Sequence, residues 1–260
     1  MQLVRNFWQS QVGKKVVMAV TGLIGVGFVI GHMVGNLQMF QPPEKINGYA
    51  HFLHHTVGGA LWLARLVLIG AVVLHVIAAY QLSRQRLAAR PVAYRKGSQW
   101  EVSTFASRTI RWGGALLLAF IVFHILHFTT RSIFPGYSEV DVYGNVVKGF
   151  RNPVVTLFYV LSMAALGLHV YHGAWSSLRS LGATPSAPNP LRRPIAALLA
   201  VVVFVGFTAV PIGVFTGIIQ PNTPRAAEPA GSARSTPAAA SPTAARPAAA
   251  KPGVTVAAEK

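Results

Sequence analysis

Six of the nine histidines in this chain of 260 residues lie inside long apolar runs. These six are His32, His75, His124, His127, His169 and His172, and they fall on four different runs. An ionisable side chain is costly inside a membrane-spanning helix, so such a residue marks a functional site by default. A single histidine often only bonds to a neighbouring helix. Four consecutive runs that each carry one indicate a shared task, and imidazole is the commonest side-chain ligand of metals.

The apolar runs have the length of membrane spans. They cover about 16–39, 59–83, 111–130, 154–178 and 194–219. Only 11% of the residues are charged, against about a quarter in soluble domains. About 20 apolar residues cross the hydrocarbon core as a helix, whereas an open sheet would expose backbone groups to lipid. We therefore predict an all-α membrane protein of five spanning helices, with the histidines in a bundle formed by the first four.

Lysine and arginine predict the orientation of the spans. One flank of the runs carries Arg5, Lys14, Lys15, Arg84, Arg86, Arg90, Arg95, Lys96, Arg108, Arg111, Arg179, Arg192 and Arg193, and the other carries Lys45, Arg65, Arg131, Lys148 and Arg151. The positive-inside rule places the larger group in the cytoplasm. The N-terminus is then cytoplasmic and the C-terminus outside. The net charge of +17 is explained by loops that meet lipid headgroups, so we expect no nucleic-acid partner.

The last segment, 221–260, is dominated by Ala, Pro, Ser and Thr. Such a composition has little to bury, so we expect this tail to be disordered.

Two of the histidines are expected in the outer half of the membrane. His32 lies 18 residues after Lys14, and His124 lies 13 residues after Arg111. At the rise of an α-helix these separations are about 27 Å and about 20 Å from the cytoplasmic charges.

Two others are expected in the inner half. His75 lies nine residues before Arg84, and His169 lies ten residues before Arg179, which is about 14 Å and about 15 Å. Depth therefore predicts an outer pair, His32 with His124, and an inner pair, His75 with His169. Side chains on facing helices of a four-helix bundle can hold a cofactor between them.

Each depth level offers two ligands, and this number favours haem iron over zinc. Zinc takes three or four protein ligands, whereas a porphyrin already supplies four nitrogens to its iron. An iron with two imidazoles has no open position, so it transfers electrons. The chain has no cysteine, which excludes thiolate sites, iron–sulfur clusters and covalent haem attachment at a C-x-x-C-H motif. We therefore expect two b-type haems.

Two further histidines compete for the ligand positions. His127 follows His124 by three residues, and His172 follows His169 by three, so each pair shares a helix face. Only one of each pair can bind a given iron. His127 and His172 lie nearer to the interfaces, so we favour His124 and His169 as ligands. His127 and His172 remain secondary candidates that could bond a propionate, a quinone or the backbone.

Five segments resemble one known family. They are GHMVGNLQMF around His32, NGYAHFLHH around His51, VLHVIAAY around His75, RWGGALLLAFIVFHILHF around His124 and LHVYHGAWS around His169. In order, spacing and position on the helices they resemble the cytochrome b anchor of succinate dehydrogenases and fumarate reductases, in the form with one five-helix polypeptide and two haems. The resemblance covers roughly residues 10–220.

The resemblance implies ligands, partners and a reaction. His75 and His169 would hold the proximal haem, and His32 and His124 the distal one. A flavoprotein subunit would oxidise succinate, and an iron–sulfur subunit would dock on the cytoplasmic face of a bacterial inner membrane. Electrons would pass through the two haems to a quinone, with menaquinone the usual one for two-haem members.

The loop before the second run is the candidate quinone site. It contains His51, His54 and His55, with Glu44 nearby. Quinone chemistry needs proton exchange, and histidine titrates in the useful range. Ordinary interfacial histidines would look the same. Arg65, just inside the second run, fits a side chain that reaches back to the interface, and a haem propionate contact is the alternative.

Two other functions fit parts of this pattern. Anchors of hydrogenases and nitrate reductases also hold two haems through paired histidines, and the neighbouring genes would distinguish them. A transporter could use histidines as a proton path, but these histidines pair by depth and do not form a continuous chain.

Overall fold

The computed structural model describes residues 1–89, 104–183 and 190–222. These residues form helices joined by short loops, with no strand among them. The tail expected to be disordered lies, from residue 223 on, outside the described residues. The five helices long and apolar enough to cross a membrane are α2 (Gln11–Asn36), α4 (Gly58–Ala88), α5 (Phe105–His124), α7 (Pro153–Ser180) and α8 (Arg192–Phe215). The predicted all-α fold with five spanning helices is therefore confirmed.

Local chemistry shifts the ends of these helices from the expected positions. Helix α8 ends at Phe215, four residues before the expected end. Gly217 adopts φ +81°, its N–H donates to the Val214 carbonyl at 3.1 Å, and the Ile219 N–H donates to the Gly213 carbonyl at 2.9 Å. This left-handed cap satisfies carbonyls at a helix end and favours glycine. Helix α5 begins six residues early because the Thr104 side chain caps it, accepting from the Ser107 N–H at 3.2 Å.

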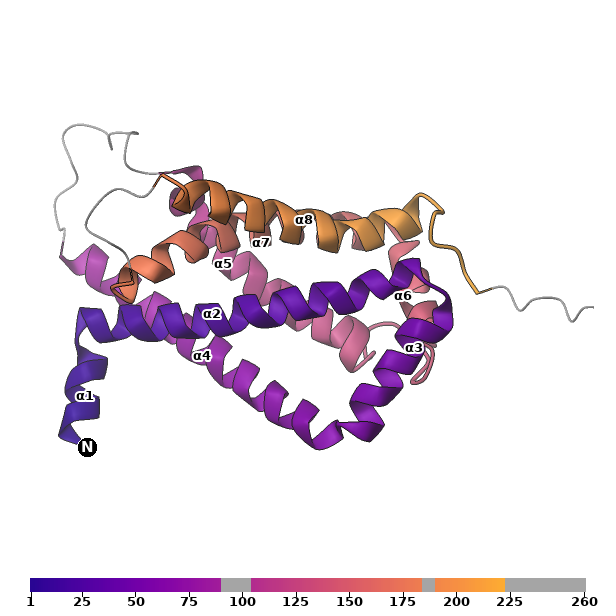
Figure 1. Cartoon of the computed structure of the whole chain (residues 1–260), viewed down its shortest axis with the longest axis horizontal. Helices are drawn as coiled ribbons and strands as arrows, with labels where there is room; N and C mark the ends of the chain where they lie inside the picture. The colour runs from indigo at the N-terminus through magenta and orange to yellow at the C-terminus, as the bar shows by residue number, and fades with distance from the viewer. Residues whose placement is uncertain (90–103, 184–189, 223–260) are drawn as a thin grey trace, which may run out of the picture. The chain divides into compact units, whose positions relative to one another are not determined.

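Six shorter elements complete the fold. They are α1 (Gln2–Gln9), η1 (Leu37–Phe40), α3 (Pro43–His51), η2 (Phe52–Thr56), η3 (Ile125–Thr129) and α6 (Val142–Phe150). The elements η2 and η3 are π-helical turns. Helix α1 turns away from α2 at Ser10, whose side chain caps α2 by accepting from the Gly13 N–H at 2.8 Å (Figure 1). We call the end of the bundle with α3 and α6 the α6 end, and the opposite end, where α1 lies, the α1 end.

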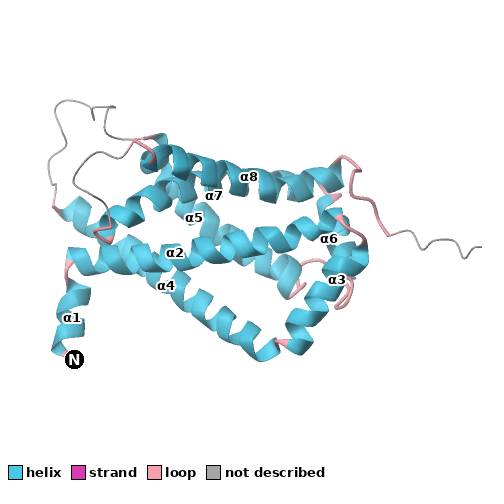
Figure 2. Ribbon diagram, in the orientation of Figure 1, coloured by secondary structure: helices cyan, strands magenta, loops and turns pink. Residues whose placement is uncertain are grey.

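The buried apolar core gathers at the α6 end. It joins η1, α3, α6, α7 and α8 through Met39, Ile46, Tyr143, Val147, Phe150, Val155, Tyr159, Val210 and Val214, with Ile219 beside them. Helix α4 packs mainly against α2, and the two diverge toward the α6 end (Figure 2). Of the five spans, this second one is the least buried within the described part of the chain.

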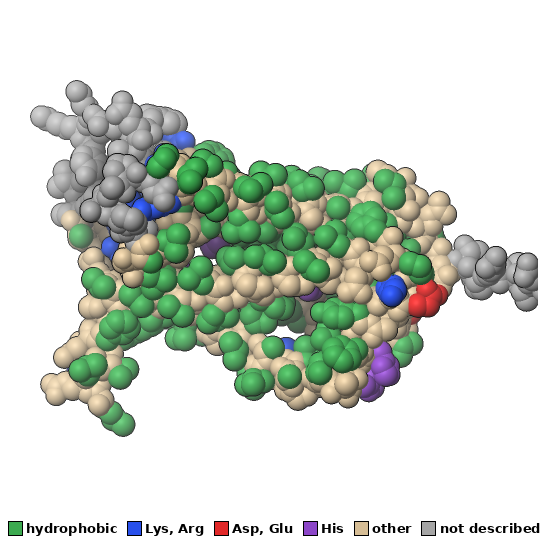
Figure 3. Space-filling model, viewed as in Figure 1, with side chains coloured by type: hydrophobic (Ala, Val, Ile, Leu, Met, Phe, Trp, Pro, Cys, Tyr) green, Lys and Arg blue, Asp and Glu red, His purple; other side chains and the backbone are tan. Residues whose placement is uncertain are grey.

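The two ends differ in charge: among the described residues the α6 end carries both acidic and basic side chains, and the α1 end carries basic ones alone. Figure 3 shows apolar side chains over the visible faces of α2, α4 and α8, as lipid contact requires. The acidic residues of the described chain, Glu44, Glu139 and Asp141, belong to α3 and to the loop that leads into α6. The α1 end carries basic residues on α1, α2 and the facing ends of α4, α5, α7 and α8.

Candidate functional site

Two histidines face each other from α4 and α7. The ring centroids of His75 and His169 lie 6.1 Å apart, with the planes inclined by 52°. The Nδ1 atom of His75 is 3.1 Å from the Met18 carbonyl oxygen and 3.2 Å from the Thr21 hydroxyl, both on α2. A carbonyl can only accept a hydrogen bond, so the neutral His75 ring carries its proton on Nδ1 and a lone pair on Nε2. That is the tautomer a metal ligand needs.

Glycines flank this inner histidine pair on α2 and α5. A Cβ atom at Gly22 would lie 3.4 Å from Cε1 of His75, and one at Gly114 would lie 3.8 Å from Cε1 of His169. The Nδ1 atom of His169 is buried and has no hydrogen-bond partner among the described residues. A buried polar atom of this kind is costly to leave unpaired, so it marks a place where a further group would be stabilising.

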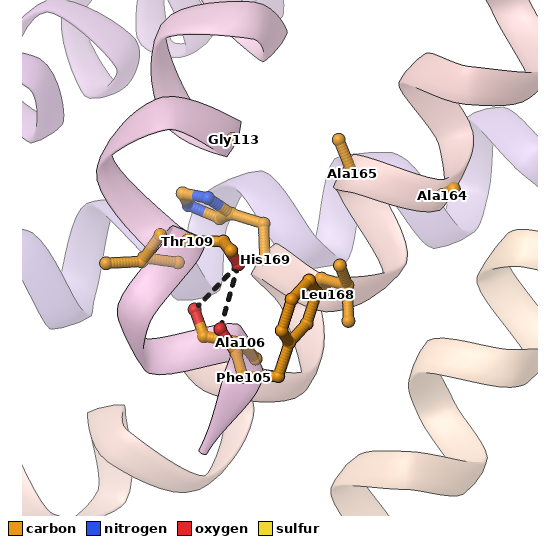
Figure 4. Close-up of a pocket in the computed structure, with 9 residues that line it drawn as sticks. Phe105, Ala106, Thr109, Gly113, Ala164, Ala165, Leu168 and His169 are labelled. Carbon is orange, nitrogen blue, oxygen red and sulfur yellow. Dashed lines mark hydrogen bonds between the residues drawn. The ribbon is translucent and has the colours of Figure 1, made fainter. Parts of the chain in front are cut away.

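A small apolar cavity lies beside His169 (Figure 4). Its volume is about 220 Å³, and its lining comes from α5 and α7, with Phe105, Ala106, Gly113, Ala164 and Ala165 among the residues. Thr109 also lines it, but its hydroxyl is used within α5, donating to the Phe105 carbonyl at 3.0 Å. The cavity is smaller than the roughly 300–1,000 Å³ typical of ligand sites, so the case for a cofactor rests on the histidine pairs.

A second histidine pair joins α2 and α5. The ring centroids of His32 and His124 lie 5.8 Å apart, with the rings edge to face at 80°. Phe28 stacks on His32 at 5.3 Å, and Phe207 of α8 lies 5.9 Å from the same ring. The amide of Asn36 lies 3.5 Å from Nε2 of His32, at the outer limit of a hydrogen bond. Both rings of this pair are half-buried.

His127 is held apart from this second pair. Its side chain is fully buried, its Nδ1 lies 2.9 Å from the Tyr159 hydroxyl, and its Nε2 lies 2.9 Å from the Tyr137 hydroxyl. Both ring nitrogens are therefore engaged. The Nδ1 atom of His124 also reaches Tyr159, at 3.2 Å, which leaves Nε2 of His124 for a ligand. This geometry favours His124 over His127 as a ligand.

His172 lies on α7, three residues beyond His169. Its ring meets Trp175 edge to face at 6.1 Å, and its Nδ1 atom is buried without a partner among the described residues. The His172 ring therefore packs against a tryptophan, and the ring that faces His75 is that of His169. The inner pair is thus the one expected from depth.

The two pairs lie at two levels of the bundle. On α2, the residue that contacts His75 is Met18. His32 lies 14 residues further along the same helix, which is about 21 Å. On α7, the residue that contacts His124 is Tyr159. His169 lies ten residues further along that helix, which is about 15 Å. Both helices give a similar separation, so the structure contains two stacked histidine pairs.

The distances within the pairs fit a metal-centred cofactor held between two imidazoles. If both rings bound one metal at the usual distance of about 2.0 Å from metal to nitrogen, their centres would lie roughly 6 Å apart. The observed 5.8 Å and 6.1 Å are close to that value. Among the described residues, no group of three or more His, Cys, Asp or Glu could hold a metal ion without such a macrocycle. The residues present therefore fit a bis-histidine haem at each level, and ligation itself stays a prediction.

The candidate quinone residues do not form one cluster. His51 at the end of α3 and His55 in η2 lie with ring centroids 4.4 Å apart. His54 points elsewhere, with its Nδ1 at 2.8 Å from the Ala50 carbonyl and its Nε2 at 3.5 Å from the Arg65 guanidinium. Glu44 lies in the first turn of α3, two turns from His51. All four candidates are exposed.

Arg65 is accounted for by local contacts. Its guanidinium carbon lies 4.8 Å from the centre of the Trp62 ring, on the same helix and one turn away. With His54 as its other neighbour, this arginine has the surroundings of an interfacial side chain. The propionate alternative gains no support from these contacts.

Three side chains with hydroxyl groups contact the histidines and were not predicted from the sequence: Tyr159, Tyr137 and Thr21. Tyr159 and Thr21 carried a usable signal, because each is a hydroxyl inside an apolar run at the depth of the histidine it meets. Tyr137 carried none, because it lies in the loop between η3 and α6 and reaches His127 through tertiary packing alone.

Together, the fold and these residues define a multi-pass helical membrane protein with two stacked pairs of intramembrane histidines. Comparison with family models, with curated proteins and with solved structures gives no match for this chain. The function is therefore argued from the site.

Proposed function

We propose that this chain is the dihaem cytochrome b subunit that anchors a succinate:quinone oxidoreductase in the membrane. The observation that carries the proposal is the pairing of His75 with His169 and of His32 with His124, at 6.1 Å and 5.8 Å between ring centroids. Four helices each contribute one ring, at two levels. The five segments that resemble the succinate dehydrogenase and fumarate reductase anchors contain the same four residues.

The histidines hold and orient two b-type haems, which supply one-electron carriers within the membrane. His75 and His169 form the proximal site, and His32 and His124 the distal site. Hydrogen bonds set the ring tautomers from outside, as the Met18 carbonyl does for His75. The apolar side chains packed beside the rings, such as Phe28 and Phe207 at His32, would keep water away from haems held there.

The α1 end is the proposed cytoplasmic and docking end. The described residues there include Arg5, Lys14, Lys15, Arg84, Arg86, Arg108, Arg111, Arg179, Arg192 and Arg193, without a described acid beside them. The positive-inside rule places this end in the cytoplasm of a bacterial inner membrane. The iron–sulfur subunit docks here with the flavoprotein subunit that oxidises succinate, next to the inner histidine pair.

The α6 end is the proposed quinone end. The rings of His51 and His55 lie 4.4 Å apart between centroids, just before the second span, and their exposure allows proton exchange with water. Glu44 and His54 are the other candidates for this role. Menaquinone is the proposed quinone, on the family resemblance alone.

Haem content tests the proposal directly. The full chain, expressed with ample haem supply and purified, should show reduced b-type spectra with about two haems per chain. His75→Ala and His169→Ala should each remove one haem, and the double variant should remove no more than that one. A preparation without haem, or four ligand variants with unchanged haem content, would overturn the proposal.

A hydrogenase or nitrate reductase anchor would pass the haem test too. Co-purification of the subunits encoded beside this chain separates the two cases, because only a succinate:quinone oxidoreductase yields a flavoprotein with succinate-dependent haem reduction. Haem reduction by hydrogen, or oxidation of the reduced haems by nitrate, in the same membranes would favour the alternative. A haem-free protein that moves protons would instead be a transporter.

A further inference from the structure

We propose that Tyr159 is a positioning residue that fixes the tautomer and orientation of His124 through a hydrogen-bonded chain running from His124 to Tyr137. The inference deepens the proposed function, since it concerns how the outer histidine pair presents a nitrogen to iron. The chain consists of His124, Tyr159, His127 and Tyr137, with successive distances of 3.2, 2.9 and 2.9 Å.

Only two proton arrangements satisfy this chain. The Tyr159 hydroxyl has one proton and lies between two Nδ1 atoms, so it donates to one ring and accepts from the other. If it donates to His124, the neutral His124 carries its proton on Nε2 and cannot bind a metal there. If it donates to His127, then His124 donates from Nδ1 to Tyr159 and keeps a lone pair on Nε2.

Ligation by His124 therefore selects one direction of proton donation along the whole hydrogen-bonded chain. Tyr159 donates to Nδ1 of His127, whose proton must then lie on Nε2, and that Nε2–H donates to the Tyr137 hydroxyl. A bond from the ligand's second nitrogen to a fixed acceptor is the usual way in which a metal-binding histidine is oriented. The inner site has the same device in the bond from His75 to the Met18 carbonyl.

Packing holds the chain in place. His127 is fully buried and Tyr159 is 5% exposed. Phe128 stacks on His127 at 3.8 Å between centroids, and Phe134 lies at 4.4 Å. His127 belongs to the π-helical turn η3, and such turns occur frequently at functional sites.

Gly149 of α6 leaves room for the outer link of the chain. A Cβ atom there would lie 2.8 Å from Nε2 of His127 and 2.7 Å from the Tyr137 hydroxyl. The hydrogen bond between His127 and Tyr137 thus occupies the space that any larger residue would need. Residues of α5, α6, α7 and the intervening loop are all arranged around this one chain.

The test compares Tyr159→Phe with Tyr143→Phe. Both changes remove a hydroxyl from a buried ring, but Tyr143 donates to the Gln220 carbonyl at 2.9 Å, outside the chain. Redox titration and low-temperature EPR of the purified full-length protein report each haem separately. The inner haem serves as an internal control.

When Nδ1–H of His124 loses its hydrogen bond, the imidazole donates less electron density to the iron. Tyr159→Phe should therefore favour the ferrous form of the outer haem. We expect the equilibrium ratio of ferrous to ferric haem to rise by up to about tenfold, which equals a rise in the reduction potential of up to about 59 mV for one electron. The g-values of the outer haem should shift as well. Tyr143→Phe should leave both haems unchanged.

Three results would overturn the inference. Unchanged outer-haem potential and g-values in Tyr159→Phe would do so while leaving the proposed function intact. Equal shifts of both haems would show general loosening instead of positioning. A wild-type protein without haem would remove the inference together with the proposed function.

A measurement on the wild-type protein decides the matter even if Tyr159→Phe fails to fold. Nitrogen-15 NMR of histidine-labelled protein in the reduced, diamagnetic state reports the tautomer of His127, identified by the loss of its signals in His127→Gln. The inference requires a proton on Nε2 and none on Nδ1. The opposite tautomer would overturn it.

Discussion

His75 on α4 and Met18 on α2 are joined by a hydrogen bond of 3.1 Å from ring nitrogen to backbone carbonyl. A carbonyl in a helix cannot turn away, so the bond fixes the His75 ring more firmly than a side-chain acceptor would. The Thr21 hydroxyl, at 3.2 Å from the same nitrogen, gives a second contact on the same helix. Since α4 packs mainly against α2, this bond also links the least buried span to the bundle.

The inner site should depend on His169 and not on His172. His169→Ala should lower the haem content from about two to about one per chain, because His75 alone cannot complete the six-coordinate iron. His172→Ala is the matched control, three residues away on the same helix, and should retain both haems. Haem and protein assays of the purified variants give the ratio. Equal losses in the two variants would contradict the assignment.

The outer site offers a parallel comparison. His124→Ala should remove the outer haem and leave the inner one, because the ring that faces His32 at 5.8 Å is lost. His127→Gln should retain both haems, since both nitrogens of His127 bond to tyrosines. Optical spectra of the reduced proteins separate the cases. If His127→Gln lost the outer haem and His124→Ala kept it, the ligand would be His127.

Much of the fold could be predicted from the sequence, because one signal dominates it. Long apolar runs with basic flanks specify spanning helices almost independently of tertiary contacts. The helix ends depended on local chemistry that hydropathy does not record, as at Thr104 and Gly217. The short helix α6 was not expected, because its nine residues are too few to span the membrane.

The histidine pairs could be predicted because helical rise converts residue number into depth. What surrounds them could not. The contact of Tyr137 with His127 depends on how a loop folds back over the α6 end. The separation of His54 from His51 and His55 follows its own contacts with the Ala50 carbonyl and Arg65, which the sequence pattern does not specify.

The space beside His127 should tolerate no added methyl group. Gly149→Ala places a Cβ atom within 3 Å of both the His127 ring and the Tyr137 hydroxyl, so one of them must move. Overpacking of this kind costs about 1–3 kcal/mol, seen as a lower midpoint of thermal unfolding in detergent. Gly173→Ala is the control, since a Cβ there meets nothing within 4 Å, and this variant should be as stable as wild type or more stable by up to about 1 kcal/mol, because alanine favours a helix interior over glycine. Equal stability of the two variants would contradict the packing described here.

Tyr137 should make the stability of the protein depend on alkaline pH. Burial raises the pKa of Tyr137 from 10.0 to about 12. Above pH 10 the unfolded chain loses this proton while the folded protein keeps it, so stability falls as pH rises from 10 to about 12. Below pH 10 the contribution is fully present.

Tyr137→Phe isolates that contribution from other groups that titrate at alkaline pH. At pH 8 the variant should be less stable than wild type by about 1–3 kcal/mol, because Nε2 of the buried His127 loses its partner. Between pH 10 and pH 12 this difference in stability between wild type and variant should narrow, since only the wild type has a proton to lose at this position. Thermal unfolding of both proteins in the same detergent at pH 8, 10 and 11 measures the gap. A gap that stays constant or widens would show that Tyr137 is not held in its protonated form by burial.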